Sequence, residues 1–391
     1  MNALRTALLG AAGAVAALLP AQQTAQQTGT EGKRAQGTTF ANGLPAGTFP
    51  LGVWLQAPGN AKRYRELGID LYVGLWEGPT RDQLAALERA GMRVICAQNE
   101  VGLAHRGKAI VGWMHGDEPD NAQGRRLKGY APPILPTVVQ ADYQRLRQAD
   151  ATRPILLNLG QGAAWDGWHG RGERTNHPED YPEYCKGCDV VSFDIYPVTH
   201  DHRDVAGKLE FVGEGVQRLR KWTGGNKPVW ACIETGHVNN AKVRPTPEQV
   251  RAEVWIAIAS GASGIVFFAH EFAPQFVEAG LLAHPEIADA VRAICTEVHA
   301  AAPVLSSPQV PDAVAVANGG ELAVRAHEHG GALWLFVASL QDELQPATFT
   351  VKGATKGRVE VAGDARPIAL VNGVFRDEIP AYGIRHYRLP R

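Results

Sequence analysis

Short apolar runs rich in β-branched residues alternate with amphipathic segments along most of the chain. The runs that predict strands cover residues 49–56, 69–76, 92–98, 109–115, 153–159, 189–196, 227–233 and 262–268. Apolar side chains recur at helical spacing over residues 61–67, 81–89, 138–150, 213–223, 246–260 and 286–301. Strands that alternate with helices are typical of a parallel sheet covered by helices. Eight such units within about 250 residues predict an α/β fold, a (β/α)8 TIM barrel at residues 49–305.

The pattern changes after Pro303. Short alternating segments separated by Gly, Asp and Asn occupy residues 321–327, 332–339, 347–351, 358–361, 367–371 and 382–389. They predict a small C-terminal antiparallel β-sandwich domain at residues 306–391. Its dipeptide Asn372-Gly373 is a strong hairpin signal.

The first residues have the features of an export signal. Arg5 is followed by an apolar stretch at residues 6–19, and Pro20-Ala21 offers a small residue for cleavage. The stretch is shorter than the roughly 20 residues that cross a bilayer, so we expect a signal peptide at residues 1–21 and no stable membrane insertion. Residues 22–48 are rich in Gln, Thr and Gly, which predicts a disordered linker. The expected location is secreted or periplasmic.

Composition narrows the class of partner. The chain of 391 residues is 45% hydrophobic and 20% charged, which is enough to bury a large core. Lys and Arg total 39 against 40 acidic residues. No excess positive charge is available for nucleic-acid phosphates, and a neutral substrate fits better.

Two glutamates stand where predicted strands end. Glu118 closes Ile110-Val-Gly-Trp-Met-His-Gly-Asp-Glu118, and Glu234 closes Pro228-Val-Trp-Ala-Cys-Ile-Glu234. The carboxyl ends of barrel strands meet at one rim, where active sites of such barrels lie. Cleavage of a glycosidic bond needs one carboxyl group to protonate the leaving oxygen and another to meet the developing oxocarbenium ion. The pair therefore predicts a glycosidase. The mechanism of such an enzyme needs no cofactor and no metal.

At these residues the chain resembles the clan A retaining glycoside hydrolases, whose acid/base glutamate follows strand four and whose nucleophile ends strand seven. The resemblance implies that Glu118 is the acid/base and Glu234 the nucleophile. It also implies that Tyr196, in Phe193-Asp-Ile-Tyr-Pro197, donates a hydrogen bond to the nucleophile. Retention requires the two carboxyl groups to lie about 5–5.5 Å apart.

One departure from the clan concerns Asp117, because clan members usually carry Asn before the acid/base, where it binds a sugar hydroxyl. An ionised Asp accepts hydrogen bonds but cannot donate them. An anionic neighbour also raises the pKa of Glu118, which suits a general acid, although Asp117 could instead cap the turn or pair with an Arg. Asp194 and Glu271 are reserve candidates, with a structural role favoured for Asp194.

Further side chains near the predicted rim could bind sugar. Aromatic rings pack against the apolar faces of pyranoses, and histidine and amide side chains bind hydroxyl groups. The candidates for substrate binding are Asp117, Tyr196, His115, His237, Trp54, Trp76, Trp165, Trp168, Asn158 and His270.

Two other functions stay open from the residues alone. Asp117 is compatible with a catalytically inactive carbohydrate-binding barrel. His115, His237, His270 and Asp117 could form the site of a metal-dependent hydrolase, but the first strand, Val53-Trp-Leu-Gln56, lacks the His-x-His pair of the barrel amidohydrolases. The expected partner is an oligosaccharide or polysaccharide, and the sequence does not identify the sugar, the mode of action or the oligomeric state.

Cysteine spacing leaves one local question open. Cys185-Lys-Gly-Cys188 could form a disulfide in an exported protein, remain as free thiols, or supply half of a zinc site. A zinc site needs two more ligands at close spacing, and none appear. Cys96 and Cys232 lie in apolar runs, as buried free thiols do.

Overall fold

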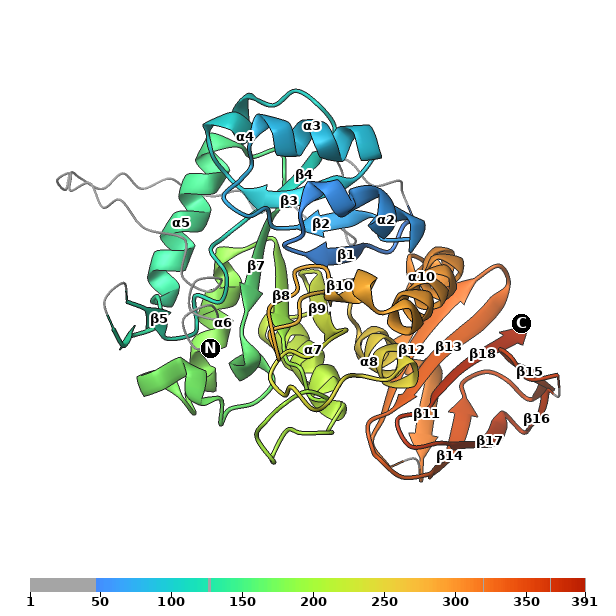
Figure 1. The fold of residues 1–391 in the computed structure, drawn as a ribbon. Coiled ribbons are helices and arrows are strands. Elements are labelled where there is room, and N and C mark those ends of the chain that lie inside the picture. The colour runs from blue at the N-terminus through green and yellow to red at the C-terminus, as the bar shows by residue number, and fades with distance from the viewer. Residues whose placement is uncertain (1–46, 126–127, 319, 366, 391) are drawn as a thin grey trace, which may run out of the picture.

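The computed structural model describes residues 47–125, 128–318, 320–365 and 367–390. Within these ranges, eight parallel strands close into a barrel (Figure 1), which confirms the predicted fold class. In order around the barrel, the strands are β1 (Leu51–Trp54), β2 (Leu71–Val73), β3 (Arg93–Ala97), β4 (Ile110–Met114), β7 (Ile155–Leu159), β8 (Val190–Asp194), β9 (Val229–Glu234) and β10 (Gly264–Phe268). Each lies inside, or within one residue of, a predicted strand. A two-stranded ribbon, β5 (Gln123–Gly124) and β6 (Tyr130–Ala131), follows β4.

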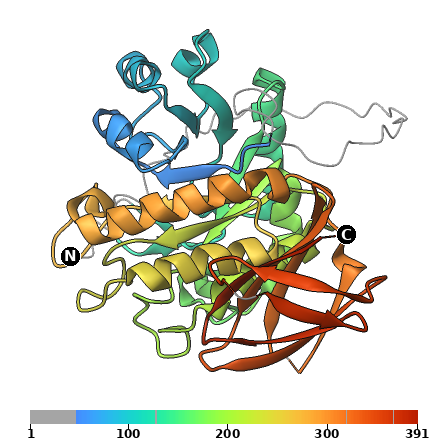
Figure 2. The same cartoon turned by 90° about the vertical axis from the view of Figure 1, so that its right-hand side faces the viewer.

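Helices surround the barrel strands (Figures 1 and 2). They are α2 (Ala61–Glu66), α3 (Arg81–Ala90), α4 (Glu100–Ala104), α5 (Pro136–Ala149), α6 (Tyr181–Tyr184), α7 (Glu210–Trp222), α8 (Pro247–Ser260), α9 (Gly280–Ala283) and α10 (Pro285–Leu305). Local chemistry sets several of their ends. Thr80 and Thr246 form capping boxes that satisfy the first backbone N–H groups of α3 and α8. Gly91 and Gly261 then end these helices in the left-handed conformation that glycine adopts most readily.

Side chains of the barrel strands alternate between two apolar layers. In β9, Ala231 and Ile233 belong to the large cluster between strands and helices, whereas Trp230 and Cys232 belong to the cluster that fills the barrel. Successive residues of a strand point to opposite faces, which explains the division. The barrel is therefore a packed core, and only the rim at the carboxyl ends of the strands is open for chemistry.

The C-terminal domain is antiparallel, as predicted. In the part of the chain that the structure describes, its strands form one eight-stranded sheet in the order β11 (Val314–Ala317), β14 (Gln345–Val351), β17 (Val374–Ile379), β16 (Ile368–Val371), β15 (Lys356–Val361), β18 (Ile384–Pro390), β13 (Ala332–Ser339) and β12 (Leu322–His329). Side chains from both halves of this sheet share one apolar core, as in a sandwich. Sequence reasoning missed β11 and β17, while the hairpin at Asn372-Gly373 is confirmed by positive φ angles of 52° and 75°.

The C-terminal domain packs on the barrel through α8 (Figure 2). The Trp255 ring of α8 stacks on Phe336 of β13, with ring centroids 5.7 Å apart. Arg325 of β12 donates a hydrogen bond of 2.6 Å to the carbonyl of Ala262. Both contacts are buried, so the domain braces this side of the barrel.

Some predictions concern residues beyond those described. The signal peptide at residues 1–21 and almost all of the linker at residues 22–48 lie outside the described residues, so export stays a prediction. Among the helices that are described, none is long and apolar enough to cross a bilayer. The five cysteines all fall in the described ranges and are free thiols, so Cys185 and Cys188 form no disulfide here.

Candidate active site

A cavity opens at the carboxyl ends of the barrel strands. Its volume is about 140 Å³, which is room for several water molecules. The residues that line it are Trp54, Leu55, Asp117, Glu118, Asn121, Gln161, Trp168, Asp194, Tyr196, Phe268, His270 and Phe272. They come from β1, β4, β7, β8 and β10 or the loops that follow these strands. None of the described residues of β9 is among them.

Carboxyl groups of Asp117, Glu118 and Asp194 meet in this cavity. Glu118 follows β4 in the left-handed conformation, with φ of 43°, and Asp194 is the last residue of β8. The carboxyl groups of Glu118 and Asp194 are neighbours that interact electrostatically, and two carboxyl groups can share a hydrogen bond only when one of them carries a proton. The Tyr196 hydroxyl donates a hydrogen bond of 3.2 Å to Asp194 Oδ2. The cavity therefore places the carboxyl groups of Glu118 and Asp194 side by side.

Burial and mutual repulsion raise the pKa values of these groups. Burial, then the charges of Asp194 and Asp117, hold the pKa of Glu118 well above its usual range. The predicted effect of Asp117 on Glu118 is confirmed, with Asp194 as the stronger neighbour. Burial also raises the pKa of Asp194 to about 7 and that of Asp117 to about 6. The direction of the Glu118 pKa shift is the one that a general acid requires.

A buried amide holds Asp117 in place. Asn158 Nδ2 donates a hydrogen bond of 2.9 Å to Asp117 Oδ1, and Ser192 Oγ donates one of 2.7 Å to Asn158 Oδ1. Asn158 was predicted to bind substrate, but it does not line the cavity. Its contacts make it a support for Asp117, because its oxygen and one amide hydrogen are already engaged.

Contrary to prediction, the structure does not bring Glu234 to this cavity. Its side chain is fully buried, and its carboxylate accepts hydrogen bonds from the backbone N–H groups of Val198, at 2.6 Å, and Thr199, at 3.0 Å. Glu253 of α8 lies on its other side. Burial raises the pKa of Glu234 to about 7, and the two backbone donors oppose this shift. Glu234 thus contacts the segment after β8 and a barrel helix, and the expected convergence with Glu118 is absent.

The other predicted residues divide between the cavity and more distant positions. Trp54, Trp168, Tyr196 and His270 line the cavity, as predicted. Trp165 does not, but its ring packs 6.4 Å from that of Trp168. These rings give the cavity the apolar walls that a sugar ring needs.

Three predicted binding residues lie elsewhere. His115 contacts the Gly187 carbonyl and Asp142, at 2.8 Å and 3.1 Å. His237 Nδ1 lies 2.7 Å from the Val243 carbonyl oxygen, and Trp76 is 44% exposed in the loop after β2. None of these three side chains reaches the cavity. The prediction was wrong because a position near the end of a strand does not by itself specify the direction of a side chain.

The described residues offer no support for the alternative of a metal-dependent hydrolase. Among the described residues, no group of three or more His, Cys, Asp or Glu side chains is placed to hold a metal ion. The reserve candidate Glu271 is engaged in an ion pair with Arg244, at 2.7 Å.

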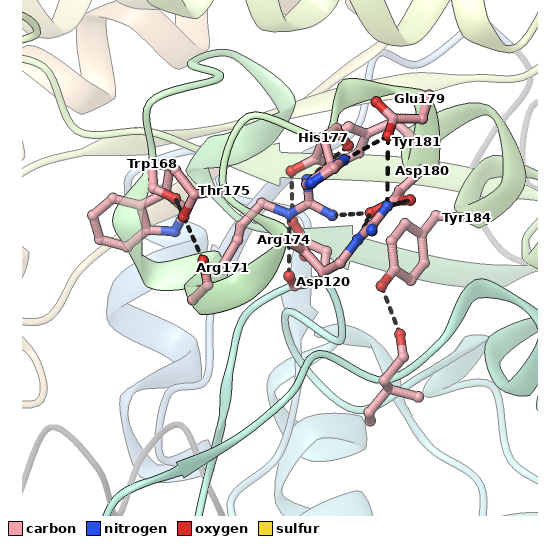
Figure 3. Close-up of polar contacts among 12 residues, drawn as sticks. Asp120, Trp168, Arg171, Arg174, Thr175, His177, Glu179, Asp180, Tyr181 and Tyr184 are labelled. Carbon is pink, nitrogen blue, oxygen red and sulfur yellow. Dashed lines mark hydrogen bonds and ion pairs between the residues drawn. The ribbon is translucent and has the colours of Figure 1, made fainter.

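A buried network supports the cavity wall that carries Trp168 (Figure 3). Asp120 accepts hydrogen bonds of 2.9 Å from both the Gly160 N–H and the Tyr181 hydroxyl. Arg171, which is 1% exposed, donates to the Asp120 carbonyl and to Asp180. Paired buried charges of this kind stabilise a loop only when their hydrogen bonds are satisfied, as they are here. The loops after β4 and β7 are thereby locked together.

Gly160 lies close to Glu118 and provides a first test of the role predicted for this residue. A Cβ at this position would lie 2.8 Å from Glu118 Oε1 and 2.7 Å from Asn121 Nδ2, so both side chains would have to move. We expect Gly160→Ala to lower kcat/KM by roughly tenfold to a hundredfold, since small displacements of catalytic groups have effects of this size. The matched control is Gly59→Ala, where a Cβ meets nothing within 4 Å. Equal activity and equal melting temperature in both variants would show that Glu118 needs no such clearance.

Sequence reasoning did not select several cavity residues. Asp194 was only a reserve candidate, although its place at the end of a predicted strand was a usable signal. Asn121, Gln161 and Phe272 lie in loops, where the sequence carried no pattern that predicts their direction. Phe268 ends β10 and was assigned to the strand alone.

Comparison with known proteins gives a partial family match. Residues 134–298 match the glycoside hydrolase family 42 model, described as beta-galactosidase. The matched span is less than half of the chain; it includes Asp194 and Glu234 and begins after Glu118. Among curated proteins, none matches this sequence.

Solved structures resemble the chain in fold. A noncanonic maltogenic alpha-amylase AmyB from Thermotoga neapolitana has a TM-score of 0.52 at 9% identity, with 88% of this chain and 99% of that chain covered. A variant of AmyP in complex with maltotriose has a TM-score of 0.51 at 10% identity, with 88% and 97% covered. At these identities the likeness shows the fold alone. The family match and the barrel together support the prediction of a glycoside hydrolase, and they leave its family open.

Proposed function

We propose that the protein is a retaining glycoside hydrolase in which Glu118 is the acid/base and Asp194, in place of Glu234, is the nucleophile. The observation that carries this proposal is that the carboxyl groups of Glu118 and Asp194 are interacting neighbours in one cavity. A sugar that enters between them has to part them, and the roughly 5–5.5 Å of a retaining enzyme needs less parting than the roughly 6.5–9.5 Å of an inverting one. Tyr196 adds support, because it donates its hydrogen bond to Asp194, as the tyrosine of the clan does to the nucleophile.

The proposed reaction has two steps. The sugar enters between Glu118 and Asp194 and parts the two carboxyl groups. Asp194 attacks the anomeric carbon while Glu118 gives its proton to the leaving oxygen, which forms a glycosyl ester on Asp194. Glu118 then takes a proton from water, and the hydroxide attacks the same carbon and releases Asp194 as a carboxylate.

Charge in the cavity favours a neutral sugar. Carboxyl groups of Asp117, Glu118 and Asp194 face it, and among the described lining residues none is Lys or Arg. An anionic sugar would meet repulsion without a compensating cation. We therefore propose neutral oligosaccharides or polysaccharides as the substrate class.

A carbohydrate-binding barrel without catalysis is the second candidate. The burial of Glu234 away from the cavity favours it, since the residue that the resemblance assigns as nucleophile cannot reach a bound sugar from this position.

One experiment separates the two candidates. The wild-type protein and the double variant E118Q/D194N are assayed against a panel of neutral aryl glycosides and polysaccharides. A glycosidase releases the aryl group from at least one substrate, and the double variant does not. A binding barrel gives saturable changes in tryptophan fluorescence with no product from either protein.

A further inference from the structure

The buried carboxyl group of Glu253 has no use in the proposed reaction. Glu253 lies in α8 and is fully buried, and no N–H or O–H donor of the described residues reaches either of its oxygens. An ionised carboxylate in such a place would carry an uncompensated buried charge, which is strongly unfavourable. Glu253 is therefore a neutral acid, and its hydroxyl has Glu234 as an acceptor. Burial, then the charge of Glu234, holds the pKa of Glu253 well above its usual range.

Glu234 has the complementary environment. Its oxygens accept backbone N–H groups from Val198, at 2.6 Å, and Thr199, at 3.0 Å. Hydrogen bonds from backbone N–H groups favour the ionised form of a carboxyl group. The pair thus has one proton, held by Glu253, and one charge, held by Glu234.

Val198 and Thr199 lie between two side chains that shape the cavity. Tyr196, two residues earlier, lines the cavity and donates to Asp194. His200, one residue later, lies with its Nε2 2.8 Å from the Oε1 atom of Gln161, which also lines the cavity. A shift of the backbone at Val198 and Thr199 would therefore move contacts on both sides.

We propose that Glu234 and Glu253 form a carboxylate–carboxylic acid pair that anchors the segment after β8 and positions Tyr196 and Gln161 at the cavity. Glu234 and Glu253 are positioning residues in this proposal, and neither touches the substrate. The consequence for catalysis rests on the proposed function, whereas the anchor itself can be measured without any activity.

Hydrogen exchange of peptides that span residues 195–200 tests the anchor directly. Three variants are compared with the wild type: Glu253→Gln, Glu253→Leu and Glu234→Gln. A Gln at position 253 donates an amide N–H to Glu234 as the protonated acid does, so slow exchange is expected to persist. Leu fills a similar volume without a donor, and we expect it to speed exchange by about tenfold or more, the effect of losing one hydrogen bond to a charged group.

Glu234→Gln completes the comparison. A Gln amide can accept from only one of the two backbone N–H groups, since its NH2 group is a donor. Exchange at residues 195–200 is expected to rise in this variant by at least the same factor as in Glu253→Leu. Peptides from the C-terminal domain serve as an internal reference for global opening.

The outcomes discriminate as follows. Slow exchange in Glu253→Gln together with fast local exchange in Glu253→Leu and Glu234→Gln supports the anchor, whether or not a glycosidase activity is found. Wild-type exchange in Glu234→Gln, or fast exchange in Glu253→Gln, overturns it. If Glu253→Leu does not fold, Glu234→Gln decides, and if Glu234→Gln does not fold, Glu253→Leu decides, because each variant by itself is expected to speed exchange at residues 195–200.

Measurements of kcat/KM test whether Glu253 acts on catalysis by positioning other residues. If the protein hydrolyses a glycoside, Glu253→Gln should retain kcat/KM within about twofold and Glu253→Leu should lose roughly tenfold, as expected for displaced contacts. Recovery of Glu234→Ala by azide, with a glycosyl azide of inverted configuration, would instead identify Glu234 as the nucleophile and overturn its role as an anchor.

Discussion

Asp194→Ala is expected to lower turnover of an aryl glycoside by on the order of 10⁴-fold to 10⁶-fold, the range seen when members of a catalytic group that act together are removed. Asp194 is the carboxyl group that interacts with Glu118 in the cavity, and in the proposed mechanism no covalent intermediate can form without it. Azide should fill the space left by the side chain and restore turnover, with a glycosyl azide of inverted configuration as the product. The measurement is the initial rate with and without azide, together with the configuration of the product by NMR.

Glu234→Ala is the matched comparison for this experiment. Its loss of activity is expected to be smaller, roughly tenfold to a hundredfold, because a displaced segment misplaces groups without removing one. Azide should not restore it. The reverse result, with recovery at position 234 and none at position 194, would assign the nucleophile as the clan resemblance implied and would exclude Asp194.

A substitution of Asp194 that lowers activity is expected to raise the stability of the fold. Burial raises the pKa of this carboxyl group to about 7, above its value in the unfolded chain. At pH values between these two pKa values, the folded protein therefore binds more protons than the unfolded chain does. Its contribution to the free energy of unfolding therefore falls as pH rises from about 4 towards 7. Asp194→Asn removes the titration, and its melting temperature at pH 7 should exceed that of the wild type by roughly 2 °C or more. Such an exchange of stability for activity is common at active sites.

Glu118→Gln is the second change with a large expected effect. Glu118 must protonate the leaving oxygen, so the loss should depend on the leaving group. We expect on the order of 10²-fold to 10⁴-fold lower kcat/KM for a sugar leaving group, and a much smaller loss for dinitrophenolate, which departs without a proton. A panel of aryl glycosides with graded leaving groups measures this dependence. Equal losses across the panel would mean that Glu118 is not the acid.

The pH profile of the wild type follows from the same pair. The active form has an ionised Asp194 and a protonated Glu118. Activity should rise as Asp194 loses its proton near pH 7 and fall at higher pH as Glu118 loses its own, because the pKa of Glu118 is raised further. For dinitrophenyl substrates, which need no proton from Glu118, the fall of kcat/KM at high pH should be absent already in the wild type, while the rise remains.

Periodicity was a sufficient guide to the barrel. Apolar runs such as residues 229–234 and 264–268 are buried on both faces, so they read as strands without any knowledge of their neighbours. Glu118 was also accessible to sequence reasoning, since a residue after a barrel strand must lie at the catalytic rim. The short edge strand Val314–Ala317 was missed because it is largely exposed and has no clear alternation of apolar and polar burial.

The sequence did not show which acidic residue lies beside Glu118 in the cavity. Asp194 and Glu234 both end apolar strands, and their sequence contexts look equivalent. Glu234 finds its backbone donors at a sequence separation of 35 and 36 residues and its carboxyl partner on a helix that covers the barrel. These contacts satisfy a buried carboxylate, whereas Asp194 has the Tyr196 hydroxyl and Glu118 beside it.

The sequence by itself determined the class of fold, the order of the strands, the rim that carries the chemistry and the candidate acids at that rim. Only the tertiary structure decided which of these acids share the cavity. The physical reason is that burial patterns depend on neighbours along the chain, while the direction and protonation of a buried carboxyl group depend on donors brought from distant segments.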